Sequence, residues 1–323
     1  MDGLIVPQTE ARAYWLAVEQ AQDYENLIAG IEGVYRRANP QVLAQRIAEA
    51  LTLAELSAAL GVVEDYQPRD TIEMNASRWR VPELFTRAAA WLLGKIEKAA
   101  TVPVKYEFAE KPVKRAPAVA AAVQLDTAAR LRTKAEQAQK EERPLDDAKK
   151  EIHALMRELG VDPVPVVSHP IIIEETQSRF ARTRETILSL DFYRAAYPFW
   201  RYSAILDDRT TVGCKALDGL TMPASDPRWV GFVPPRHWHC RAHVVAVTHS
   251  EGVNAKKTAP DEQYAGDGSF GTLVDEWEPK PGSYPKDLWD IYAEAKGIAS
   301  PHIELEGAWW KKKSTSSNTD GQP

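Results

Sequence analysis

Apolar residues recur at helical spacing through the first hundred positions of the chain. One stripe with three- and four-residue steps predicts a single helix that carries Tyr14, Val18, Ala21, Tyr24 and Ile28. Asn39 followed by Pro40 predicts the start of the next helix, because asparagine caps a helix and proline needs no amide hydrogen in the first turn. We therefore expect a helical N-terminal region over residues 1–100.

Local capping signals divide this region further. Thr52 and Glu55 have the spacing of a capping box, which predicts the start of a short helix that Gly61 ends. Another helix is predicted to begin near Pro82. Its apolar face carries Phe85, Leu92 and Ile96.

The pattern changes after residue 100. Apolar and charged residues alternate over 104–108, which predicts a short strand, and the prolines that follow interrupt regular structure. We therefore expect a strand and linker over residues 101–124. Residues 125–169 are rich in charges of both signs and predict a charged helical connector that is broken at Pro144.

A second change follows the next helical pattern. Residues 171–198 predict one long helix, which Pro198 ends. Short extended pieces and turns then predict antiparallel strands in a compact domain over residues 170–250. Residues 251–323 predict a Gly/Pro-rich extension with one helix at 285–296 and a disordered tail. The expected fold class is α+β: a mostly helical N-terminal region, a long helix and a small antiparallel α+β domain.

Composition narrows the class of protein. The chain has 323 residues, and its 46 acidic and 40 basic side chains give a formal net charge of −6, which argues against a dedicated nucleic-acid binder. Two cysteines cannot build a disulfide framework for a chain of this size. The first residues lack a secretory signal, and no apolar run approaches the roughly 20 residues that span a bilayer. We expect a soluble protein in a reducing compartment, with no membrane partner.

Both cysteines and three of the seven histidines fall within residues 214–243. His237 and Cys240 are three residues apart, and Cys214 lies upstream after a turn, an arrangement that can close around zinc. His239 or His243 is a candidate fourth ligand. Three alternatives remain open: a structural zinc ion on Cys214, His237 and Cys240, a disulfide, or two buried thiols without metal. No other cofactor is expected.

Paired carboxylates follow the first predicted strand. Asp207 and Asp208 can bind a metal or act as general acid and base. Alternatively, an aspartate caps a turn while Arg209 pairs with a carboxylate and joins two loops. We favour the structural interpretation, because no nucleophile and base stand at a recognisable spacing.

Neighbouring motifs are also typical of a structural role. Asp218 and Gly219 predict a tight turn with positive φ, and Pro234 and Pro235 stiffen the approach to His237. The large apolar side chains expected in the core are Trp200, Trp229 and Trp238.

Taken in order along the chain, these residues resemble the phage Mu F-like family of minor head, or head-morphogenesis, proteins of tailed bacteriophages. The residues that carry the resemblance are Trp200, Asp208, Arg209, Thr210, Cys214, Leu217, Asp218, Gly219, Asp226, Pro227, Trp229, Pro234, Pro235, His237, Cys240 and Arg241. The family often has a second cysteine where this chain has Ala242. The resemblance covers residues 170–290 and assigns 170–250 to a Mu F-like head morphogenesis domain.

The resemblance implies a structural function. Such proteins associate with the portal vertex and the inside of the forming capsid, so the expected partners are the phage portal protein, the major capsid or scaffolding protein, and packaged DNA. The expected location is the inside of the virion head, and the host cytoplasm during assembly. We therefore expect a minor capsid protein that is not an enzyme. The alternative is a metal-dependent nuclease or toxin-like enzyme that uses Asp208, His237 and His239.

Overall fold

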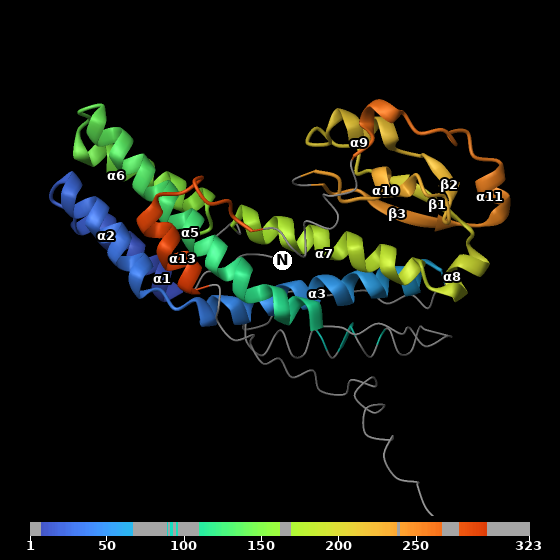
Figure 1. The fold of residues 1–323 in the computed structure, drawn as a ribbon, viewed down its shortest axis with the longest axis horizontal. Helices are drawn as coiled ribbons and strands as arrows, with labels where there is room; N and C mark the ends of the chain where they lie inside the picture. The colour runs from blue at the N-terminus through green and yellow to red at the C-terminus, as the bar shows by residue number, and fades with distance from the viewer. Residues whose placement is uncertain are drawn as a thin grey trace, which may run out of the picture.

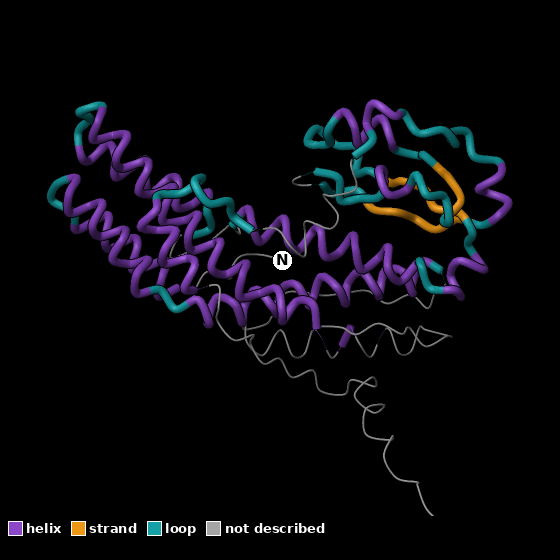
Figure 2. The backbone as a smooth tube through the Cα atoms, in the orientation of Figure 1, coloured by secondary structure: helices purple, strands orange, loops and turns teal. Residues whose placement is uncertain are grey.

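The computed structural model of the chain describes residues 8–66, 89, 91–92, 95, 110–161, 169–237, 240–266 and 278–295. Figures 1 and 2 show two parts: a long assembly of helices and, at one end, a smaller unit that contains the strands. The mostly helical α+β fold class is therefore confirmed.

The helices and strands of the described chain divide between the two parts as follows. The helices of the long assembly are α1 (Gln8–Gln20), α2 (Tyr24–Arg37), α3 (Pro40–Asp65), α5 (Glu110–Lys140), α6 (Leu145–Glu158), α7 (Pro170–Leu188) and α13 (Lys286–Ala295). The smaller unit contains α8 (Asp191–Ala196), β1 (Phe199–Ser203), α9 (Val212–Leu217), β2 (Thr221–Pro223), α10 (Trp229–Phe232), β3 (His243–Val247), α11 (His249–Val253) and the 3-10 helix η1 (Glu262–Tyr264).

The first predicted helix is two helices. Asp23 has an extended backbone, and its carboxylate accepts a hydrogen bond from the Asn26 amide at 2.7 Å, so it caps a new helix, α2. The apolar stripe crosses this turn because both helices face the same core: Tyr14, Val18 and Ala21 are buried. The prediction of one helix was therefore wrong.

Helix α3 confirms one capping prediction and contradicts another. The Asn39 side chain accepts from the Gln41 amide at 3.0 Å, as expected of an N-cap before Pro40. Thr52 and Glu55, however, are buried inside α3, and the Thr52 hydroxyl donates to the Ala48 carbonyl one turn back. The helix continues through Gly61 because its packing against α5 and α7 outweighs the glycine's preference for ending it.

The predicted linker is also wrong where it can be compared. Residues 110–124 form the first half of α5, with Pro117 inside the helix. The helix forms here because an alanine-rich face lets α5 pack closely among its neighbours. Ala116, Ala120 and Ala121 on this face are completely buried. The strand predicted at 104–108 lies outside the described residues, as does the helix predicted from Pro82 apart from Leu92 and a few neighbours. The break at Pro144 is confirmed, because α6 begins directly after it.

The long helix predicted over 171–198 is interrupted. Helix α7 ends at Leu188, where the Ser189 hydroxyl donates to the Glu185 carbonyl, and the extended backbone of Leu190 turns the chain into α8. The three-stranded sheet that follows is antiparallel with the order β2-β1-β3, and Trp200 pairs with both Met222 and Ala246. Strand β3 packs on α7.

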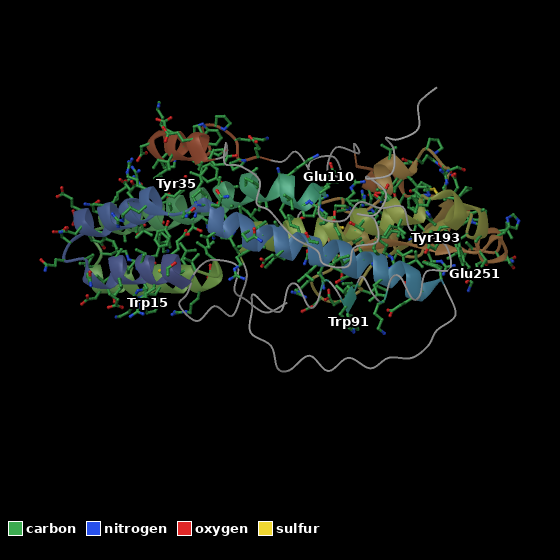
Figure 3. All side chains as sticks on the ribbon, turned by 90° about the horizontal axis from the view of Figure 1, so that it is seen from below. Trp15, Tyr35, Trp91, Glu110, Tyr193 and Glu251 are labelled. Carbon is green, nitrogen blue, oxygen red and sulfur yellow. The ribbon has the colours of Figure 1, made fainter. Side chains whose placement is uncertain are left out.

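Two hydrophobic cores lie along α3. The first involves α1, α2, α5, α6, α13, the first half of α3 and the start of α7. The second lies between the other half of α3, the end of α7 and the smaller unit, which is called the sheet unit from here on. The two ends can be followed in Figure 3, which labels Trp15 and Tyr35 at one end and Tyr193 and Glu251 at the other. A buried polar belt from α3, α5 and α7 lies between the cores and consists of Thr52, Glu55, Arg115, Glu174, Glu175, Ser178, Arg179 and Thr183.

The helix predicted at 285–296 is confirmed as α13. The sequence did not indicate that it packs against the N-terminal helices, where Leu288 and Tyr292 are fully buried. The Tyr35 hydroxyl donates to the Leu288 carbonyl at 3.3 Å. The tail beyond Ala295 lies outside the described residues. Among the described helices, none is both long enough and apolar enough to cross a membrane.

Candidate functional site

The two cysteines and His237 meet in the smaller unit. Cys214 lies on α9, where the Thr211 hydroxyl caps the helix by accepting from the Cys214 amide at 3.3 Å. His237 and Cys240 lie on the irregular segment between α10 and β3, where the Cys240 amide donates to the His237 carbonyl at 3.1 Å. One hydrogen bond thus fixes the start of α9 and the other fixes the turn from His237 to Cys240. The fold then brings the three side chains together.

The distances in this cluster are short. The Cys214 sulfur lies 3.0 Å from Nε2 of His237 and 4.0 Å from the Cys240 sulfur. The three candidate ligand atoms all lie within 4.8 Å of one another. Both cysteines are buried, and His237 is half-buried at the edge of the cluster. Cys214, His237 and Cys240 are therefore brought together as the sequence analysis anticipated for a shared site.

Hydrogen bonds around Cys214 favour its thiolate. The hydrogen bond with Cys240 lowers the pKa of the Cys214 thiol most, and bonds with His237, Thr211 and Tyr202 lower it further. The hydrogen bond with Cys214 and burial raise the pKa of the Cys240 thiol. The Tyr202 hydroxyl lies 3.1 Å from the Cys214 sulfur, and burial raises its own pKa. Cys214 is therefore the more acidic thiol of the pair.

One of the three alternatives for the cysteines does not fit this geometry. A disulfide has sulfurs about 2.05 Å apart, whereas here they are 4.0 Å apart and both thiols are free. Of the candidate fourth ligands, His239 lies outside the described residues. His243 lies near the charges of Arg184 and Asp65, outside the group of Cys214, His237 and Cys240.

Of the paired carboxylates, Asp207 caps a turn and pairs with an arginine, as the structural interpretation predicts, but the arginine is a different one from that expected. Asp207 accepts from the Arg209 amide at 3.1 Å and from the Thr210 hydroxyl at 3.0 Å, so it caps a turn as expected. Arg241, not Arg209, forks onto its carboxylate, with bonds of 2.7 and 2.5 Å. The Arg241 guanidinium holds the pKa of Asp207 well below its usual range. The expected pairing of Arg209 was therefore wrong. The Arg209 side chain is 75% exposed, and its Nε comes no closer than 3.9 Å to the Asp207 carboxylate.

The residues named for a nuclease do not meet in the described chain. Asp208 is exposed and is not part of the cluster formed by Cys214, His237 and Cys240. His239 lies outside the described residues. The described part of the chain therefore does not bring a carboxylate into the histidine and cysteine cluster.

The other motif residues shape the unit. Gly219 has φ of +79°, as predicted for the turn, and Asp218 accepts from the Ala204 amide at 2.8 Å. Trp200 and Trp229 are buried with ring centroids 5.9 Å apart, which confirms them as core; Trp238 lies outside the described residues. Pro234 and Pro235 are buried in the segment that leads to His237.

Three residues of the site were not named from the sequence. Tyr202 lies on the inner face of β1, two positions after Trp200. Because side chains alternate between the two faces of a strand, the burial of Tyr202 could have been predicted from that of Trp200. Thr211 has the N-cap spacing to Cys214, a local signal that was available. The Lys257 ammonium donates to the carbonyls of Ala216 and Asp218 at the end of α9, a long-range contact that no local pattern predicts.

Comparison with known proteins finds relatives of this part of the chain. Residues 171–245 match the family described as phage Mu protein F like protein. The Mu-like prophage FluMu F protein of Haemophilus influenzae (strain ATCC 51907 / DSM 11121 / KW20 / Rd) is 43% identical over 51 residues, which cover 16% of this chain and 12% of that protein. No solved structure matches the chain. The resemblance seen in the motif residues is thus confirmed: residues 171–245, from α7 into β3, are similar to the phage Mu protein F-like family.

Proposed function

We propose that the chain is a non-catalytic minor capsid protein of a tailed bacteriophage, which acts in head morphogenesis at or near the portal vertex. The observation that carries the proposal is the family match over residues 171–245. The family resemblance implies a location in the virion head, with the portal protein and the major capsid or scaffolding protein as partners. The arrangement of the sheet unit supports a docking function.

An exposed apolar loop is the surface that we assign to docking. Residues 204–212, here called the docking loop, comprise the connection from β1 to α9 and Val212, the first residue of α9. Ile205, Leu206 and Val212 are 52%, 56% and 72% exposed, although water disfavours such side chains at the surface. Figure 1 shows α9 on the side of the sheet unit that faces away from α7. The loop is therefore open to a partner.

The docking loop is held in one shape. Leu206 has φ of +55°, a conformation that is uncommon for a non-glycine residue and persists where the surroundings impose it. The Asp207 carboxylate, held by Arg241, and the Asp218 carboxylate, bonded to the Ala204 amide, fix the loop on both sides of Leu206. A rigid apolar loop loses little conformational entropy on binding, which favours attachment to a larger assembly.

The docking loop can be tested in the phage that encodes the chain. With the gene deleted and the chain supplied from a plasmid, we expect the double variant Leu206→Asp and Val212→Asp to lower the yield of infectious particles by about tenfold or more, because a buried unpaired charge weakens an interface by more than 1.4 kcal/mol. Val253→Asp is the matched control, because Val253 is 58% exposed on α11, at the other end of the sheet unit (Figure 1).

The controls separate docking from folding. Circular dichroism and melting temperature of the purified double variant should equal those of the wild type, because the substituted side chains are exposed. The control Val253→Asp should restore the yield fully. Full restoration by the double variant, or a deletion without any effect on the yield, would contradict the proposal.

A further inference from the structure

The cluster of Cys214, His237 and Cys240 has the composition of a zinc site. Zinc in proteins is bound by thiolate sulfur and imidazole nitrogen, and these soft and borderline ligands select it over magnesium or calcium. Two thiolates and a neutral imidazole around Zn²⁺ give a group with no net charge, which suits the interior better than an isolated thiolate does. The ligand types therefore point to zinc.

The distances fit tetrahedral coordination. Zn–S bonds of about 2.3 Å and a Zn–N bond of about 2.0 Å place two sulfurs about 3.8 Å apart and a sulfur and a nitrogen about 3.5 Å apart. The sulfurs of Cys214 and Cys240 are 4.0 Å apart, and Nε2 of His237 is 3.0 Å from the Cys214 sulfur. All three ligand atoms lie within 4.8 Å of one another, so a shift of the His237 ring on the order of an ångström would seat the ion.

A small cavity adjoins the cluster. It has a volume of about 10 Å³ and is lined by Cys214, His237, Thr211 and Arg241, among others. This volume suits one water molecule. A water in it can supply the fourth ligand of a tetrahedral ion that takes its other three ligands from the chain.

A structural ion would stabilise the fold around the cluster. The segment from Val233 to Ala242 has no helix or strand where it is described, and the helices of the sheet unit are short. An ion on Cys214, His237 and Cys240 would tie this segment to α9. Small units with few regular elements often depend on such a cross-link.

We propose that Cys214, His237 and Cys240 bind one zinc ion, with a water as fourth ligand, and that the ion fixes the segment between α10 and β3 onto α9. The Tyr202 hydroxyl, 3.1 Å from the Cys214 sulfur, donates a hydrogen bond to the thiolate in the bound state. This proposal does not depend on the proposed role in the phage head.

Metal content of the full chain tests the proposal. Protein purified without chelator from zinc-supplemented cells should contain about one zinc per chain by mass spectrometry of the elements. Cys214→Ser, Cys240→Ser and His237→Asn should each reduce this content by about tenfold or more. His249→Asn is the control, since His249 is an exposed imidazole on α11 outside the cluster, and it should retain the zinc.

A second measurement remains informative if a variant does not fold. Cobalt added to metal-free wild-type protein should give a thiolate-to-cobalt charge-transfer band and the strong visible bands of tetrahedral cobalt, and zinc should remove both. Wild-type protein without zinc and without these cobalt bands would overturn the proposal. So would an intact mass lower by two hydrogens, because it would show a disulfide between Cys214 and Cys240, or an unchanged zinc content in the cysteine variants.

Discussion

Single residues in the sheet unit act through the groups that surround them. His243 begins β3, and burial, followed by the positive charge of Arg184, lowers its pKa from 6.5 to about 4. Cys214 shows the opposite behaviour, since its neighbours favour the charged form. Both effects come from segments that are distant in the sequence, so neither residue's chemistry follows from its sequence neighbours alone.

The shifted pKa of His243 predicts a pH dependence of stability. A histidine whose pKa is lowered by folding stays neutral in the folded state and binds a proton more readily when unfolded, so acid destabilises the protein. We expect His243 to reduce the free energy of unfolding as pH falls from about 6.5 to 4, by up to about 3 kcal/mol. Melting temperatures of wild type and His243→Asn over this range measure the effect. An equally steep decline in the variant would contradict it.

At the scale of elements, the packing distances decide which glycines can change. Gly252 on α11 lies against Phe199 of β1, and a Cβ at this position would overlap the phenylalanine ring. Gly33 on α2 is different, because a Cβ there would meet only the flexible end of the Arg37 side chain, at 3.2 Å. The same substitution therefore has opposite consequences in two helices.

Two alanine substitutions test this contrast. Gly252→Ala should lower the free energy of unfolding by about 1–3 kcal/mol, because α11 must move away from the sheet. Gly33→Ala should raise it by up to about 1 kcal/mol, because alanine is the better helix former. Chemical denaturation of both variants measures the two changes. A Gly252→Ala variant as stable as the wild type would show that α11 does not pack on Phe199 as described.

Elements whose signals are local could be predicted from the sequence. Asn39 caps α3 and Gly219 adopts positive φ because the determining contacts lie within a few residues. The predictions that rested on Thr52 and Pro117 were wrong, because burial among α3, α5 and α7 outweighs the local preferences of these two residues. The candidate zinc ligands could be predicted from their spacing in the sequence. The ion pair of Asp207 could not, because its partner Arg241 is distant in the sequence and reaches Asp207 only in the folded chain.

At the scale of the molecule, α3 and α7 join the two parts. Each helix contributes to both hydrophobic cores, so the sheet unit is mounted on the helical assembly through continuous helices rather than through a linker. The buried ion pair of Arg115 and Glu175, at 2.6 Å, lies in the polar belt between the cores. The sheet unit, which carries the docking loop, thus lies at one end of an elongated molecule (Figure 2).

This architecture suits a protein that attaches to a larger assembly, and we propose the phage head as that assembly. The most direct test is quantitative mass spectrometry of heads purified from the phage that encodes the chain. We expect the chain to be present in the heads, in far fewer copies than the major capsid protein. Phage particles that lack the chain and are nevertheless fully infectious would contradict this role.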